Sequence, residues 1–149
     1  MSQGNETAIT VLNNLVETCR DGQEGFRTAA EHVKDPQLKQ LFTRYAQQRT
    51  QFVTELQGEI RRLGGDPDRS GSVAGALHRG WMNIRSAVSG DDDHAIVAEA
   101  ERGEDAAKAA YEDALQQGLP TAARGLVEQQ YARVKEAHDW VRALRERAA

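Results

Sequence analysis

Residues 64–93 read GGDPDRSGSVAGALHRGWMNIRSAVSGDDD, and this stretch decides how the rest of the chain folds. The glycines and proline at its start predict a helix stop and a turn, and the serine, glycine and aspartates at its end predict another helix boundary. The stretch is too long for a plain loop in a small domain. Its apolar residues recur at helical spacing, which predicts a short crossover helix at about residues 73–88. Those residues are Val73, Leu77, Trp81 (or Gly80), Ile84 and Val88.

Long amphipathic helices are expected on both sides of this stretch. Apolar residues recur there every three or four positions, and no segment shows the sustained alternation of a β-strand. Asp35 and Pro36 predict the N-cap and first residue of one such helix. We expect four long helices, at about residues 6–34, 36–63, 93–117 and 121–147.

The lengths of the connections predict the topology. The first and last links are short, so each joins two helices into an antiparallel hairpin. One long crossover between two helical hairpins is the connectivity of ferritin-like folds. The sequence therefore predicts an all-α, ferritin-like four-helix bundle with a short crossover helix between its second and third long helices. We expect residues 1–149 to form a single domain.

Composition narrows the class of protein. The 19 basic and 23 acidic residues give a net charge of -4, so the chain lacks the basic excess that is typical of nucleic-acid-binding proteins. No apolar run approaches the roughly 20 residues that span a bilayer, and the N-terminus does not resemble a signal peptide. The single cysteine, Cys19, excludes an intramolecular disulfide and fits a reducing compartment. We expect a cytoplasmic protein that binds neither nucleic acid nor membrane.

Polar residues on the apolar helix faces are the candidate site. A helical projection places one such residue on the inner face of each long helix, and two more on the flanks. The four central ones fall near the mid-height of the bundle, where ferritin-like proteins hold two metal ions. The central residues are Gln23, Arg49, Glu104 and Gln130, and the flanking ones are Gln48 and His138.

These residues do not suit a dinuclear iron or manganese centre. Such a centre needs a Glu from each of two helices and a Glu-x-x-His from each of the other two. The chain offers amides at Gln23 and Gln48, and it contains no Glu-x-x-His; the segment that ends in His138 has the wrong spacing. Glu104 alone would leave two divalent ions under-neutralised. We expect no cofactor, with iron or manganese as the alternative.

An ion pair suits the residues better. Arg49 has the reach and the planar fork to hold Glu104 through two hydrogen bonds. We expect Gln23, Gln48 and Gln130 to satisfy the donors and acceptors that remain. Two alternatives stay open: a mononuclear or weak metal site on the same residues, and an Arg49 side chain that bends out to solvent.

The chain resembles a known family over nearly its whole length. It is similar to the ferritin-like bacterial four-helix-bundle family catalogued as domain of unknown function 2383. The resemblance implies a ferritin-like bundle in bacteria and no established reaction. Members often carry Glu where this chain has Gln23 and Gln48, so it also implies a departure toward a metal-free core. The resembling stretches are LVETCRDGQEGF (15–26), GSVAGALHRGW (71–81), ERGEDA (101–106) and VKEAH (134–138).

Glycines and a tryptophan mark further packing sites. Glycine inside a helix costs about 1 kcal/mol relative to alanine, so we expect close helix packing at Gly22, Gly25 and Gly103. Trp81 and Met82 predict either core packing or, as the alternative, a partner interface.

Three aspartates, at positions 91 to 93, precede His94. Acidic residues are favoured at a helix N-terminus by the helix dipole. We therefore expect a capped helix start there, with a metal-binding cluster as the alternative.

No catalytic motif stands out. The sequence lacks a nucleophile elbow, a dinucleotide fingerprint and a phosphate-binding loop. The leading prediction is a non-catalytic bundle that acts as a binding or stress-associated structural protein, with an unknown protein partner or a second copy of itself. The alternative is a degenerate iron- or manganese-binding oxidoreductase or storage protein. A third reading is an oligomeric scaffold assembled through the crossover helix.

Overall fold

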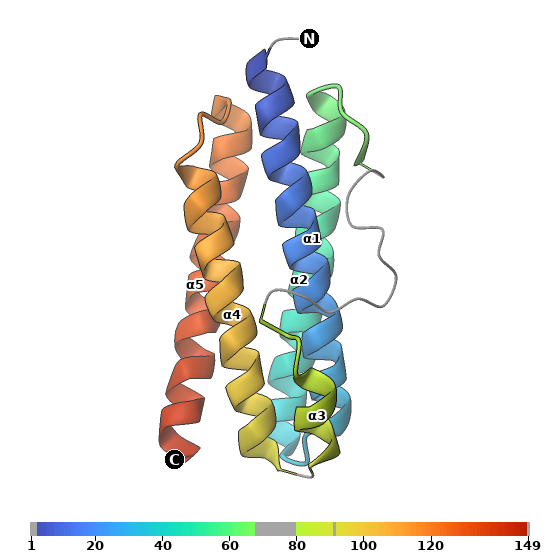
Figure 1. Ribbon diagram of the computed structural model, residues 1–149, viewed down its shortest axis with the longest axis vertical. Helices are drawn as coiled ribbons and strands as arrows, with labels where there is room; N and C mark the ends of the chain where they lie inside the picture. The colour runs from blue at the N-terminus through green and yellow to red at the C-terminus, as the bar shows by residue number, and fades with distance from the viewer. Residues whose placement is uncertain (1–2, 68–79, 91, 149) are drawn as a thin grey trace.

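The computed structural model describes residues 3–67, 80–90 and 92–148, and these residues form helices and no strand (Figure 1). The all-α prediction is confirmed, and each long helix begins and ends within about one turn of its predicted bounds. The helices are α1 (Gln3–His32), α2 (Pro36–Arg62), α3 (Ile84–Ser89), α4 (Asp93–Leu115) and α5 (Thr121–Ala148).

Two antiparallel hairpins make up the bundle. α1 packs along α2, and α4 packs along α5, while α1 also contacts α4 and α2 contacts α5. Figure 1 shows that α2 ends at the end of the bundle that carries the N-terminus, whereas α3 and the start of α4 lie at the opposite end. One long crossover therefore joins the two hairpins, as the length of the middle link predicts.

Local sequence signals explain the bounds of α2. The Asp35 side chain accepts a hydrogen bond from the backbone N–H of Gln37 at 2.8 Å, and Pro36 opens the helix. At the other end Gly64 has a φ of 91°, and the N–H of Gly65 donates to the Ile60 carbonyl at 2.9 Å. This left-handed ending suits glycine, because a residue with a side chain is strained at positive φ.

The start of α4 is fastened to the first hairpin. Asp92 caps α4 by accepting from the N–H of His94 at 3.0 Å. The Asp93 carboxylate accepts from the backbone N–H groups of Lys34 and Asp35 at 2.9 and 3.0 Å. Both side chains bind backbone groups, which agrees with a capping role; Asp91 lies outside the described residues.

Within the described residues, only the end of the predicted crossover helix is helical, as α3 (Ile84–Ser89). Residues 73–79 of the expected helix lie outside the described residues, and residues 80–83 are not helical. Gly80 has a φ of 96°, and a Cβ there would lie 2.4 Å from the Arg102 carbonyl oxygen, so the chain turns tightly against α4. Trp81 lies before the turn and Ile84 lies after it, at the start of α3, and both side chains are buried in the core. Their helical spacing therefore does not come from one continuous helix.

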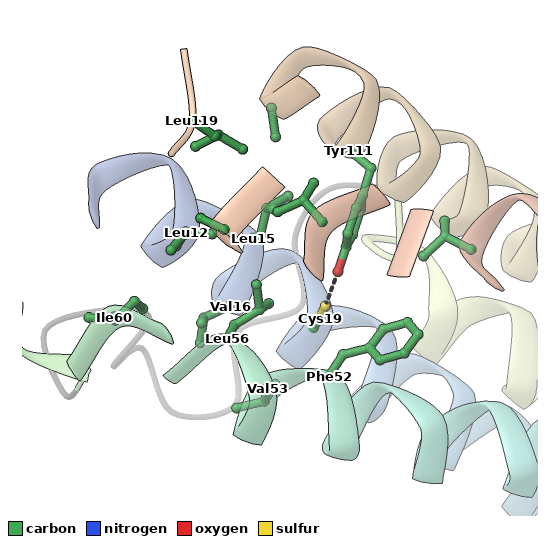
Figure 2. Packing of buried hydrophobic residues seen from close by; sticks show 14 of the residues in the cluster. Leu12, Leu15, Val16, Cys19, Phe52, Val53, Leu56, Ile60, Tyr111 and Leu119 are labelled. Carbon is green, nitrogen blue, oxygen red and sulfur yellow. Dashed lines mark hydrogen bonds between the residues drawn. The ribbon is translucent and has the colours of Figure 1, made fainter. Parts of the chain in front are cut away.

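The core consists of two hydrophobic clusters stacked along the bundle. The upper cluster, at the end that carries the N-terminus in Figure 1, surrounds Leu12, Val16 and Leu56 (Figure 2). The lower cluster surrounds Phe26 and Phe42. Within the described residues, none of the helices is both long and apolar enough to cross a membrane.

Candidate functional site

Arg49 and Glu104 form an ion pair inside the bundle. Arg49 lies on the buried face of α2, and Glu104 lies on that of α4. Nη1 of Arg49 donates to Oε1 of Glu104 at 2.7 Å, and Nη2 donates to Oε2 at 2.8 Å. Their side chains are 1% and 0% exposed. The two-bonded pair that the sequence predicts is present, and the alternative in which Arg49 reaches solvent is wrong.

The ion pair separates the two hydrophobic clusters. The Arg49 Cζ atom lies 5.4 Å from the ring centre of Phe26, in the lower cluster, and 6.0 Å from that of Phe52, in the upper one. Aromatic faces attract a cation at such distances. A Cβ at Gly22 would lie 3.2 Å from Nη1 of Arg49, so α1 leaves room for the guanidinium. Residues of α1, α2 and α4 thus together position the Arg49 guanidinium.

Burial and pairing act in opposite directions on Arg49. Burial lowers the pKa of Arg49, but the adjacent Glu104 carboxylate outweighs burial and holds this pKa above its usual value. The guanidinium is therefore permanently charged. The same surroundings act on Tyr45, whose pKa is raised to about 12 by burial and then by the Glu104 charge.

Only one of the predicted amides contacts the ion pair. Oε1 of Gln48 accepts a hydrogen bond from Nε of Arg49 at 3.3 Å. Gln23 instead lines a groove of about 380 Å³ between α1 and α2, beside Ala30 and Ala46. The structure does not bring Gln23 to the ion pair, because its neighbour Gly22 is the α1 residue that faces Arg49.

Gln130 belongs to a second buried network, in the upper cluster. Figure 2 shows the Cys19 thiol beside the Tyr111 hydroxyl, with 3.1 Å between Sγ and the phenolic oxygen. The Tyr111 hydroxyl donates to Oε1 of Gln130 at 2.6 Å. Nε2 of Gln130 donates to Oε1 of Glu55 at 3.0 Å and to the Phe52 carbonyl at 3.3 Å. Gln130 therefore satisfies Tyr111 rather than the ion pair.

The thiol and the phenol of this second network stay protonated at neutral pH. Burial raises the pKa of Cys19 to about 11 and raises the pKa of Tyr111 well above its ordinary value. Because the thiolate is the form that attacks electrophiles and binds metals, Cys19 is neither an active nucleophile nor a ready ligand.

His138 lies at the contact between α4 and α5. Its Nε2 is 2.7 Å from Oδ1 of Asp105, and its Nδ1 is 3.1 Å from Oδ1 of Asp139. The hydrogen bond from His138 is the main cause that lowers the pKa of Asp139. His138 thus joins two helices through carboxylates, and it is not brought to Arg49 and Glu104.

Trp81 lies in the core rather than on a surface. Its side chain is 1% exposed and packs edge-on against Phe26, with ring centres 4.9 Å apart. An interface role for Trp81 is therefore wrong for the folded chain, whereas Met82 is 74% exposed. The glycines that predict close helix packing make room for side chains instead: Gly22 for Arg49, and Gly25 and Gly103 for Trp81.

Sequence reasoning missed the roles of three polar residues. Glu99 is 1% exposed and accepts from the Asn83 backbone N–H at 2.7 Å and from Nε of Arg102 at 2.8 Å. Its position four residues before Gly103 places it on the inner face of α4 and could have revealed it. Tyr111 shows only helical spacing in the sequence, which does not reveal its hydrogen bond to Gln130. No spacing rule links Asp105 to His138 across two helices.

The arrangement does not fit a dinuclear carboxylate centre. Both oxygens of Glu104 are bound by a guanidinium that carries a permanent positive charge. A divalent cation would have to displace that charge or lie beside it, and the nearby amide of Gln48 could not neutralise it. Within the described residues, no three His, Cys, Asp or Glu side chains are grouped to hold a metal ion.

Comparison with known proteins gives a family and no activity. No curated protein matches the chain. Residues 7–117 match the model of a family described as Domain of unknown function (DUF2383). The matched part includes Arg49 and Glu104, and it ends before Gln130 and His138. Because the match covers well over half of the sequence, the chain belongs to the DUF2383 family.

Proposed function

We propose that this chain is a non-catalytic, ferritin-like bundle in which an ion pair takes the place of a metal centre. It acts as a binding or stress-associated structural protein, and its partner is another protein or a second copy of the chain. The single long crossover between two hairpins supports the ferritin-like relationship. The single cysteine, Cys19, is a free thiol, which agrees with a reducing bacterial cytoplasm.

The ion pair of Arg49 and Glu104 is the observation that supports this proposal. Two fully buried charges satisfy each other through two hydrogen bonds, so no net charge is left to attract a cation. Removing either partner would strand the other in the core, which is strongly unfavourable. The centre of the bundle therefore serves packing rather than ligand exchange.

Metal analysis tests the proposal. We expect protein purified from medium supplied with iron and manganese to hold well under one metal ion per chain, and a titration with Fe²⁺ or Mn²⁺ to show no saturable binding. Glu104→Gln is the matched variant, because it removes the one central carboxylate. About two metal ions per chain in the wild type, lost in Glu104→Gln, would overturn the proposal.

A metal-binding oxidoreductase or storage protein is the second candidate. Two observations favour this candidate. The crossover connectivity is that of ferritin-like folds, and polar residues lie at the height at which such bundles carry metals. The outcome of the same titration that overturns the first proposal would support the metal site that this one requires.

A further inference from the structure

His138 of α5 lies between two carboxylates. Its Nε2 is 2.7 Å from Oδ1 of Asp105 in α4, and its Nδ1 is 3.1 Å from Oδ1 of Asp139, the next residue of α5. The His138 side chain is 8% exposed, whereas those of Asp105 and Asp139 are 60% and 58% exposed. Water therefore solvates both carboxylates, while the ring between them depends on the protein for its hydrogen bonds.

The two contacts determine how many protons the ring carries. An ionised carboxylate only accepts hydrogen bonds, so each ring nitrogen of His138 must donate one. A neutral imidazole has a single N–H, and its other nitrogen would direct a lone pair at a carboxylate oxygen. Only the imidazolium, which has a proton on both nitrogens, satisfies Asp105 and Asp139 together. The pKa of Asp139 is lowered mainly by the hydrogen bond from His138, which agrees with this arrangement.

His138 is flanked by two further polar contacts between α4 and α5. On one side of it, the Tyr131 hydroxyl donates to Oε2 of Glu112 at 2.8 Å. On the other side, Arg145 forms an ion pair with Glu101. Tyr131, His138 and Arg145 are spaced seven residues apart, so they lie on one side of α5. Near neutral pH a phenol stays neutral and a guanidinium stays charged, whereas a histidine titrates between pH 5 and 8, so the central contact is the one that responds to pH.

Two lysines lie among the charges around His138. The Lys108 ammonium of α4 lies 3.2 Å from Oε2 of Glu112, a carboxylate that is close enough to respond to the charge of His138. The Lys135 ammonium of α5 lies 3.3 Å from Oδ2 of Asp139, the oxygen that His138 does not bind. Each lysine thus balances a carboxylate other than that of the α4 aspartate, whose charge is left to the imidazolium.

We propose that His138 is a pH-sensitive contact that holds α5 against α4 while its ring carries two protons. Loss of one proton leaves a ring lone pair facing Asp105 or Asp139, so one of the two contacts becomes repulsive. The native chain therefore binds the second proton more tightly than the unfolded chain does, and this stabilisation is complete in mild acid and lost as the pH rises through neutrality. α2 packs on the other flank of α5, which carries Gln130, so the pH-sensitive contact belongs to the second hairpin. It does not depend on the central ion pair or on whether the bundle binds metal.

Counting the protons on His138 by NMR tests the assignment directly. Long-range ¹H–¹⁵N spectra distinguish an imidazolium from either neutral tautomer, and His138→Gln identifies the signals. At pH 6.5, the ordinary midpoint of a histidine, we expect both ring nitrogens of His138 to be mainly protonated. A ring that is mainly neutral at this pH would overturn the proposal.

Asp105→Asn tests the origin of the effect. It should lower the midpoint of the His138 titration by about one pH unit, because it removes the charge that holds the second proton. Asp113→Asn makes the same exchange at an exposed position of α4 and is the matched control, which should leave the midpoint unchanged. Equal effects of the two variants would mean that Asp105 does not hold the proton, and the proposal would fail.

Urea unfolding at pH 5.5 and pH 8 tests whether the proton stabilises the fold. His138→Gln retains a polar side chain that cannot ionise. We expect the folding equilibrium constant of the wild type, divided by that of His138→Gln, to fall at least about fivefold between the two pH values. His94→Gln, at an exposed histidine of α4, is the control, and its ratio should change less than about twofold. A ratio for His138→Gln that stays constant or rises with pH would overturn the proposal.

Discussion

The charges of Arg49 and Glu104 can be buried together, whereas either charge alone would be strongly unfavourable in the core. Each side chain leaves water completely, and each recovers two short hydrogen bonds from the other. The aromatic faces of Phe26 and Phe52 add a favourable field for the cation. The energy of this arrangement therefore depends on the pair rather than on either residue.

Arg49→Ala is expected to destabilise the fold by about 3–5 kcal/mol, because it leaves the Glu104 carboxylate buried without a partner. Urea unfolding followed by circular dichroism measures the change. Adding Glu104→Gln should restore part of the loss, since a neutral amide is cheaper to bury than a lone charge. A loss below about 0.5 kcal/mol in the single variant would show that the pair does not hold the core.

Cys19 makes the stability of the fold depend on pH. The pKa of Cys19 is raised from 9.0 to about 11 by burial, so between these values the unfolded chain loses the thiol proton while the native chain keeps it. Ionisation then favours the unfolded state: this contribution to stability is complete below pH 9 and is lost as the pH rises toward 11.

Raising the pH from 8 to 10 should cost the wild type about 1 kcal/mol more than it costs Cys19→Ala, which has no thiol to ionise. Urea unfolding at both pH values measures the difference. The effects of Tyr45 and Tyr131 cancel, since both remain in each protein, whereas Tyr111, whose pKa is raised by burial and then by Cys19, contributes to the measured difference. Parallel pH profiles for the two proteins would mean that the thiol ionises equally in the native and unfolded states.

At the scale of single elements, the sequence predicts where α2 begins and ends, but it does not predict the turn before α3. Asp35, Pro36 and Gly64 mark the ends of α2 because each acts on backbone groups within a few residues. Trp81 lies one helical turn before Ile84, and periodicity alone cannot tell a helical stripe from a side chain that enters the core from a turn.

Asp93 fastens the start of α4 to the first hairpin, since its carboxylate accepts from two N–H groups of the turn between α1 and α2. Asp93→Ala should destabilise the fold by about 1–2 kcal/mol. It should also speed the hydrogen exchange of the Lys34 and Asp35 amides. Asp92→Ala, which removes only the cap of α4, is the control and should leave those two amides unchanged. Equal exchange in both variants would mean that Asp93 does not fasten the hairpins.

At the scale of the whole molecule, the sequence predicts two hairpins, a crossover and polar residues in the core. It does not predict that these residues divide into separate networks. An error of one residue turns a side chain by 100°, which is why Gln23 was placed where Gly22 lies. Gln130 and His138 find partners on Tyr111 and Asp105, and such contacts between helices leave no periodic trace.

The ion pair lies between the two hydrophobic clusters of the core, which makes its replacement informative for the whole bundle. The double variant Arg49→Met/Glu104→Leu would join the two clusters through side chains of similar volume. Replacing a buried ion pair in this way is often neutral or stabilising by about 1–4 kcal/mol. We therefore expect its thermal midpoint to equal or exceed that of the wild type, although Arg49→Ala alone lowers it. A double variant as unstable as Arg49→Ala would mean that the charges, and not only their mutual satisfaction, specify how the two hairpins pack.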